Sequence, residues 1–208
     1  MFDQLSLFDT SSPPPVVPLE TGGMPSPDQQ LHSLFFALTP EPALAQTIAN
    51  QTLGWVRENG VGGKPRPAQL LHISLHLIGS YTGEIPAERV QFARGIAQAL
   101  STRSFELTLD RAMSFKGRTP PYVLRVGNGL EQIQTLWRDI GMAIADAGGP
   151  SREANFTPHM TLAYGQRVVP AHPVAPISWT VKDFVLIDSH FGAATYRTLG
   201  RWPLQGQM

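Results

Sequence analysis

The sequence contains Leu71-His72-Ile73-Ser74-Leu75 and Pro158-His159-Met160-Thr161-Leu162, two copies of the pattern His-x-(Ser/Thr)-Leu, one in each half of the chain. Both copies lie in stretches that predict strands. Successive side chains of a strand point to opposite faces, so the histidine and the hydroxyl of each copy share one face. The apolar residues share the other face. We expect two imidazoles and two hydroxyls to converge where the two halves of the chain meet.

An imidazole beside a hydroxyl, present twice, suits the opening of a cyclic phosphodiester. The reaction needs a base that deprotonates water and an acid that protonates the leaving ribose oxygen. Histidine, with an unperturbed pKa near 6.5, can act in either role near neutral pH. The hydroxyls can donate hydrogen bonds to the phosphate oxygens as charge builds on them. We therefore predict His72 and His159 as catalytic residues and Ser74 and Thr161 as phosphate-binding residues.

The alternatives for these histidines are a structural role within a strand and a metal site. Zinc and non-haem iron sites usually add Asp, Glu or further His at close spacing. The neighbours of His72 and His159 are hydroxyls and apolar residues. An imidazolium can also offset the single negative charge of the diester. We therefore expect neither a metal nor a cofactor in this site.

Composition limits the classes of function. The chain has 208 residues and no cysteine, which excludes disulfides and thiolate chemistry. Its 16 basic and 16 acidic side chains cancel, so we expect any contact with nucleic acid to be local, at an end or a few nucleotides. No apolar run approaches the roughly 20 residues of a membrane span. The first residues lack the layout of a signal peptide, so we predict a cytoplasmic protein.

We expect two regions along the chain. Residues 1–30 are rich in proline and glycine among polar residues and predict a flexible tail. Residues 31–208 predict one globular domain in which strands and helices alternate. The expected strands are 34–38, 69–78, 105–109, 121–126, 159–164, 181–188 and 196–204. The expected helices are 42–58, 86–100 and 130–147.

The two motifs resemble those of the two-histidine phosphoesterases, specifically the bacterial and archaeal RNA 2′,3′-cyclic phosphodiesterases, also called 2′-5′ RNA ligases (LigT-like). The resemblance runs from about Leu34 to Leu204, nearly the whole predicted domain. Beyond the motifs, it includes the first expected strand, Leu77-Ile78-Gly79 and the segment Phe156 to Ala163 around the second motif.

This resemblance implies a fold and a division of roles. The fold would be α+β and bilobal, with two antiparallel-rich sheets and outer helices related by a pseudo-two-fold axis around a central groove. His72 would protonate the leaving 3′ oxygen, and His159 would activate the water. The product would be a 2′-phosphate, made without a metal. RNA ends or cyclic nucleotides would be the substrates.

Three positions depart from the family's usual pattern. Ser74 stands where Thr is usual, His76 where a basic residue is frequent, and Tyr164 where Arg is frequent. By strand alternation, His76 is expected on the face of His72, either lining the outer groove or facing solvent. Other candidates for phosphate binding, each with a solvated surface charge as the alternative, are Arg125 on an expected strand and the loop residues Lys64, Arg66 and Arg118.

Three other functions stay open at this point. The same groups could join RNA ends through a 2′-5′ bond or open a small cyclic nucleotide. A non-catalytic nucleotide- or RNA-binding module would keep the scaffold. Histidines in both motifs argue against that module, because binding alone does not require a matched acid and base.

The N-terminus holds a second signal. Gln4-Leu5-Ser6-Leu7-Phe8 resembles the pentapeptide with which bacterial replication and repair proteins dock on the sliding clamp. In that role Leu7 and Phe8 would fill an apolar pocket while Gln4 makes polar contacts. The alternatives are an ordinary disordered tail and a strand that caps the domain.

A peptide spanning these residues should bind the bacterial sliding clamp in a direct binding assay. Replacing both Leu7→Ala and Phe8→Ala should remove the apolar anchors and abolish the signal. Equal binding by the two peptides would end the sliding-clamp interpretation.

Overall fold

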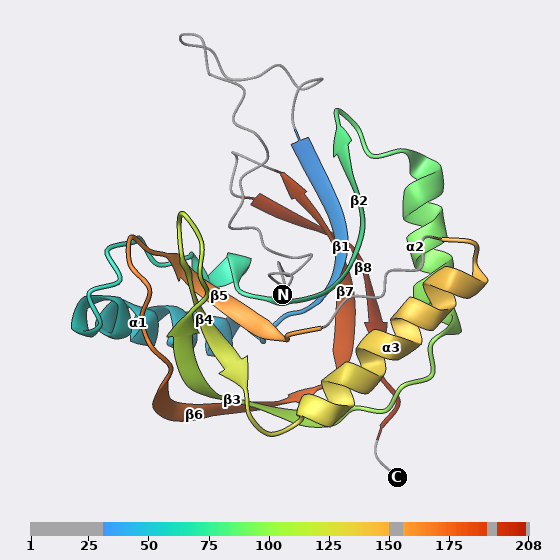
Figure 1. Cartoon of the computed structure of the whole chain (residues 1–208). Helices are drawn as coiled ribbons and strands as arrows, with labels where there is room; N and C mark the ends of the chain where they lie inside the picture. Colours follow the sequence, from blue (N-terminus) through green and yellow to red (C-terminus); the bar gives the residue numbers. More distant parts are fainter. Residues whose placement is uncertain (1–30, 150–155, 191–194, 207–208) are drawn as a thin grey trace, which may run out of the picture.

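The computed structural model describes residues 31–149, 156–190 and 195–206. The predicted tail, including the pentapeptide at its start, lies outside these residues, so the domain boundary near residue 30 stays a prediction. Figure 1 shows the elements. The helices are α1 (Pro42–Glu58), α2 (Ala87–Ala99) and α3 (Leu130–Asp146), with a 3₁₀ turn η2 (Ala68–Leu70). The strands are β1 (Leu31–Leu38), β2 (Ile73–Thr82), β3 (Phe105–Ser114), β4 (Pro121–Val126), β5 (His159–Tyr164), β6 (His172–Val181), β7 (Asp183–His190) and β8 (Thr195–Pro203).

The strands form one sheet in the order β6-β3-β4-β5-β2-β1-β7-β8, with antiparallel neighbours. Its two four-stranded halves meet through a single registered pair, Ile73 of β2 with Met160 of β5. In each half the motif strand is innermost, and a helix links it to its neighbour, as β1-α1-β2 and as β4-α3-β5. The predicted α+β class is confirmed, with the two halves joined into one sheet. The pseudo-two-fold axis and the central groove stay predictions.

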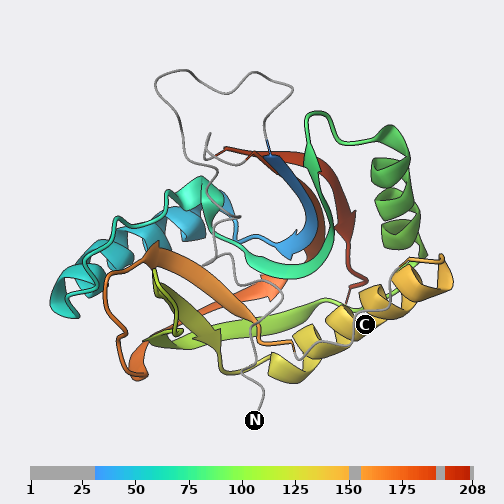
Figure 2. The ribbon, with the colours of Figure 1, turned by 45° about the horizontal axis from the view of Figure 1, so that its top comes forward.

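The helices pack on both halves of this sheet. In both views α2 and α3 lie together at one end of the molecule and α1 lies at the other (Figures 1 and 2). α1 packs against β5 and η2, whereas α3 packs against β2 and α2 against β8. The main core includes Ile73 and Met160, both fully buried, so it is continuous across the joint. No helix in the described part of the chain is long and apolar enough to cross a membrane.

β6 is a strand that was not predicted, since no strand was expected between residues 164 and 181. Pro173 and Pro176 lie within it, and proline lacks the N–H that a strand contributes to its ladder. β6 is an edge strand, paired only with β3. An edge strand needs hydrogen-bonding groups on one side only and therefore tolerates proline.

A β-bulge in β2 changes the face on which His76 lies. Ala37 of β1 pairs with Ser74 of β2, and Phe35 of β1 pairs with Leu77 of β2. A step of two residues along β1 therefore corresponds to a step of three residues along β2. The extra residue in β2 shifts the alternation by one. His76 therefore turns away from the face of Ser74. The prediction that His76 shares that face is wrong, because period-2 alternation does not hold across a bulge.

His76 instead connects β2 to α3. Its side chain is buried, and Nε2 donates a hydrogen bond of 2.7 Å to the carbonyl of Trp137. The imidazole stacks on the indole of Trp137 with ring centroids 4.9 Å apart, and that indole stacks on Phe156 at 5.2 Å. His76 is thus part of the packing between sheet and helix, and neither lines the phosphate site nor faces solvent.

Replacing His76→Ala should lower the free energy of unfolding by about 2–3 kcal/mol, because it leaves a void and removes the donor to a helix carbonyl. His76→Phe should keep the stack and recover part of the loss. Denaturant unfolding followed by circular dichroism measures both. The exposed Arg118→Ala is the control, with an expected change within about 0.5 kcal/mol. An unchanged midpoint for His76→Ala would contradict this assignment.

Candidate active site

The pairing of Ile73 with Met160 brings the two motifs side by side. Because β2 and β5 are antiparallel, His72 lies beside Thr161, and Ser74 lies beside His159. Both paired residues are fully buried, so their sequence neighbours point to the opposite face of the sheet. We name this the motif face. Its four motif residues, each half-buried, are His72, Ser74, His159 and Thr161.

Each motif histidine is oriented by a main-chain carbonyl two residues earlier. Nδ1 of His72 lies 2.9 Å from the Leu70 oxygen, and Nδ1 of His159 lies 2.8 Å from the Thr157 oxygen. A carbonyl oxygen only accepts, so Nδ1 carries the proton in the neutral ring and Nε2 is the basic nitrogen. Nε2 of His72 lies 3.0 Å from Ser74 Oγ, whose hydroxyl therefore donates to it in the neutral state.

The surroundings of His72 favour its neutral form. Burial lowers the pKa of His72 from its ordinary value of 6.5 to about 4. The hydrogen bond to the Leu70 carbonyl raises this pKa, while the positive charge of Arg66 and the electrostatic interaction with His159 lower it. His72 is therefore neutral at pH 7 without a bound anion. The electrostatic coupling to His159 fits two rings that share one small site.

Aromatic side chains frame both histidines. The His72 ring lies 5.3 Å from Phe35 and 5.3 Å from Tyr196, measured between ring centroids, and the His159 ring lies 4.8 Å from Phe115. Phe35 and Tyr196 belong to a small apolar cluster on the motif face, separate from the main core. None of these three rings was predicted to lie in the site. No local pattern marks them, because strand pairing brings Tyr196 there from β8 and a turn brings Phe115 from the end of β3.

Arg66 lies at the joint between the two halves. Its backbone N–H donates to the Leu162 carbonyl at 2.7 Å, which fixes it beside β5. Its guanidinium lies over the ring of Tyr164, 5.8 Å from the centroid, and Nη2 donates to the hydroxyl of Tyr196 at 2.8 Å. Its Nε is buried and has no hydrogen-bond partner among the described residues. The structure thus places this predicted candidate close enough to His72 to lower its pKa.

Arg125 occupies the corresponding place beside the second motif. It pairs with His159 across β4 and β5, so both side chains lie on the motif face. Its guanidinium lies over the ring of Phe115 at 5.7 Å, and Nη1 contacts the sulfur of Met113 at 3.9 Å. Its Nε is also buried without a partner within the described segments. A buried unpaired donor is costly, and an anion on this face would satisfy it.

The other predicted candidates are less closely tied to this site. Lys64 precedes η2 and Arg118 lies in the turn between β3 and β4, both exposed, and their part in binding stays a prediction. A cavity of about 510 Å³ lies elsewhere, at the start of α3, and contains no histidine that could serve as acid or base. Its lining residues are Arg103, Ser104, Phe105, Glu106, Asn128, Gly129 and Gln132.

Two imidazoles, two hydroxyls and two guanidinium groups thus gather at the motif face, a set of groups whose chemistry suits a phosphate ester. The family model of the 2′-5′ RNA ligase superfamily matches residues 40–192, which include both motifs. The chain belongs to this superfamily, whose members are two-histidine phosphoesterases.

Individual relatives agree with this membership. The RNA 2′,3′-cyclic phosphodiesterase of Escherichia coli (strain K12) is 28% identical over 185 residues, covering 82% of this chain and 96% of that protein. The crystal structure of E. coli LigT complexed with 3′-AMP matches with a TM-score of 0.65 and 26% identity, over 84% of this chain and 98% of that chain. The TT0787 protein of Thermus thermophilus shares the fold, with a TM-score of 0.66 and 23% identity over 85% of this chain and all of that chain.

The pKa of His72 gives a direct test of the site. In a proton NMR titration, the ring signals of His72 should shift with a midpoint near pH 4 in the free protein. Sulfate, whose charge is constant over this range, should raise the midpoint, because a nearby anion stabilises the imidazolium. His172, whose Nε2 contacts Tyr122 and whose Nδ1 contacts a carbonyl, serves as the reference ring. A His72 midpoint near 6.5, or no response to sulfate, would contradict this description.

Proposed function

We propose that this protein hydrolyses 2′,3′-cyclic phosphates at RNA ends to 2′-phosphates, with His72 and His159 as acid and base and without a metal. The pairing of Ile73 with Met160 carries the proposal, because it sets both imidazoles and both hydroxyls on one face. The names of the relatives support it. One is an RNA 2′,3′-cyclic phosphodiesterase, of which this chain spans 96%, and a solved LigT structure holds 3′-AMP.

The reaction needs one proton removed and one proton supplied. Nε2 of His159 takes a proton from a water molecule, whose oxygen forms a bond to phosphorus. The bond from phosphorus to the 3′ oxygen breaks, and Nε2 of His72 gives that oxygen its proton. The product carries a 2′-phosphate and a free 3′ hydroxyl. His159 ends protonated and His72 neutral, and exchange with solvent restores both rings.

The substrate's own charge makes His72 a competent acid. With a pKa of about 4, the free ring holds a proton in only a small fraction of molecules at pH 7. The anionic diester favours the imidazolium and raises this pKa, so proton uptake accompanies substrate binding. Protonation also turns Nε2 into a donor. Ser74, which donates to Nε2 in the neutral state, is then released to donate to a phosphate oxygen.

Four groups would hold the phosphate. Ser74 and Thr161 would donate to its non-bridging oxygens from either side of the joint. Arg66 and Arg125, whose buried Nε groups have no partner in the described part of the chain, would supply positive charge. These guanidinium groups lie over aromatic rings and would bring two positive charges to the phosphate, although the basic and acidic side chains of the whole chain cancel. This arrangement suits a single phosphate at an RNA end.

Two related reactions would use the same groups. Joining RNA ends through a 2′-5′ bond follows the same course with a 5′ hydroxyl in place of water. The 5′ oxygen gives its proton to His159 and bonds to phosphorus, the bond to the 3′ oxygen breaks, and that oxygen takes the proton of His72. The name of the matching family favours this reaction as the second candidate. A small cyclic nucleotide offers the same diester without a long chain. We propose RNA ends as partners and the cytoplasm as the location, and retain sliding-clamp docking as a separate prediction.

Replacing His72→Ala or His159→Ala should each lower turnover of an oligonucleotide 2′,3′-cyclic phosphate by at least roughly 10²-fold, because each removes one proton transfer. His172→Ala is the matched control, a histidine with the same contact to a carbonyl two residues earlier but on β6, and should keep turnover within about twofold. Circular dichroism confirms that each variant folds.

The same assay separates the alternatives. Activity should survive a strong chelator, and the product should carry a 2′-phosphate. Greater turnover of a cyclic mononucleotide, or joined ends as the main product, would redirect the assignment to one of the two related reactions. Binding of the oligonucleotide with no turnover by the unmodified protein would point to a non-catalytic module. Full activity in either histidine variant would contradict the proposed roles.

A further inference from the structure

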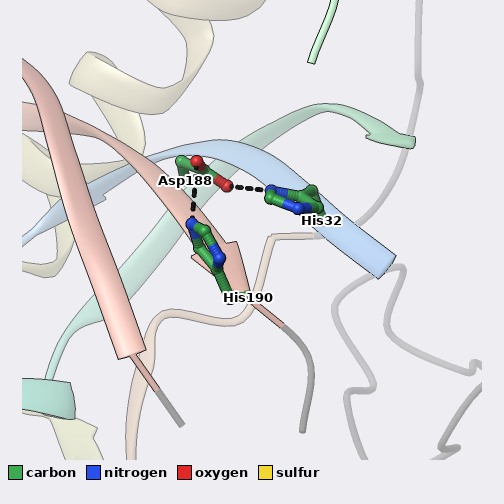
Figure 3. A group of neighbouring side chains, drawn as sticks. All are labelled: His32, Asp188 and His190. Atoms are coloured by element: carbon green, nitrogen blue, oxygen red, sulfur yellow. Dashed lines mark hydrogen bonds and ion pairs between the residues drawn. The ribbon is translucent and has the colours of Figure 1, made fainter. Parts of the chain in front are cut away.

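His32, Asp188 and His190 form a second cluster of ionisable side chains (Figure 3). They come from β1 and β7, which pair so that His32 faces His190 and Leu34 faces Asp188. Cross-strand partners share a face, and Leu34 belongs to the main core. Phe35, which contacts His72, points to the other face. The cluster therefore lies on the opposite side of the sheet from the motif face.

The side chains converge on one buried carboxylate. Nδ1 of His32 lies 2.9 Å from Oδ1 of Asp188, and Nε2 of His190 lies 3.1 Å from Oδ2. The side chain of Asp188 is 1% exposed, that of His32 10% and that of His190 25%. Solvent therefore reaches the cluster mainly on the side of His190. One ring nitrogen from each histidine and one carboxylate oxygen lie within 4.8 Å of one another.

These atoms are of the types that ligate transition metals, and they lie close enough together to converge on one ion. Zinc binds imidazole nitrogen and carboxylate oxygen at about 2.0–2.2 Å, which sets tetrahedral ligand atoms about 3.3 Å apart. The distances of 2.9 and 3.1 Å join the two nitrogens to different oxygens of Asp188, and the ligand atoms lie within 4.8 Å of one another, so the three side chains must close by up to about 1.5 Å around an ion. Two imidazoles exclude magnesium and calcium as preferred ions, since both prefer oxygen ligands. Within the described ranges, no other group of three such residues comes this close together.

We propose that His32, Asp188 and His190 bind one zinc ion, with the fourth position open to water. The ligands come from two neighbouring strands, so the ion would tie the start of β1 to the end of β7. Arg197 competes for the same carboxylate, with Nη2 3.4 Å from Oδ2 of Asp188. Its side chain is 68% exposed and can swing into solvent when the ion binds. The site lies apart from the acid–base pair and takes no part in hydrolysis.

Isothermal titration of the chelator-treated, full-length protein with zinc chloride tests the proposal. We expect one equivalent to bind and the melting temperature to rise with it, because the ion binds only the folded state. His190→Gln and Asp188→Asn should each weaken binding at least roughly tenfold and remove the thermal shift. His190→Gln is the more informative variant, since its side chain is partly exposed and the fold depends on it less than on Asp188.

Three further variants locate the ion. Arg197→Ala keeps all three ligands and removes the competing guanidinium, so it should bind zinc at least as tightly. His172→Gln should bind as the unmodified protein does. The His72→Ala, His159→Ala double variant should also keep the site, which separates it from the motif face. Addition of cobalt should give visible absorption bands of a tetrahedral ion, and these should be absent from His190→Gln.

Three results would overturn the proposal. They are no zinc binding by the unmodified protein, equal binding by the folded His190→Gln variant, and loss of the ion in the double motif variant. None of these depends on the proposed hydrolysis. The chelated protein should keep its full phosphodiesterase activity, and His190→Gln should leave that activity unchanged. Failure of the zinc site and failure of the hydrolase proposal are therefore distinguishable.

Discussion

The backbone pairing of Ile73 with Met160 is the single registered contact between β2 and β5, the strands at which the two halves of the sheet meet. Both side chains are fully buried in a core that continues through the joint, so the pairing is held by apolar packing on the helix-covered face. The polar residues that flank Ile73 and Met160 in the sequence must therefore point to the opposite face of the sheet. The relative position of the two motif histidines is thus set mainly by the hydrophobic core on the opposite side of the sheet.

Local sequence patterns predicted a helix or strand correctly where the periodicity of that element alone determines its structure. The bounds of α1, β4 and β5 agree with those expected from the sequence, and α3 differs by one residue at its end. The chemistry-bearing face of both motifs also followed from alternation. No local sequence pattern indicates which strands become neighbours, so the joining of the two halves at one residue pair was not predicted. The positions of Phe35, Phe115 and Tyr196 around the two histidines were not predicted for the same reason.

Two errors have specific physical causes. β6 was not predicted as a strand, and it contains two prolines, which an edge strand tolerates because it needs ladder hydrogen bonds on one side only. The bulge in β2 moved His76 from the expected face to the packing beneath α3, where it bonds Trp137. Alternation across Ser74 held because the irregularity comes after it. The faces of the motif residues were therefore predicted correctly, and the face of the residue just beyond the first motif was not.

Both motif histidines donate their Nδ1 proton in a hydrogen bond to the carbonyl of the residue two places earlier, at Leu70 and at Thr157. A carboxylate partner can be lost through one codon, but a peptide oxygen is present whatever side chain occupies its position. Sequence drift at these two sites therefore leaves the ring tautomers intact as long as the local backbone path is preserved. The local backbone geometry therefore fixes the tautomer of each ring, and replacing the side chain of Leu70 or Thr157 leaves the accepting carbonyl in place.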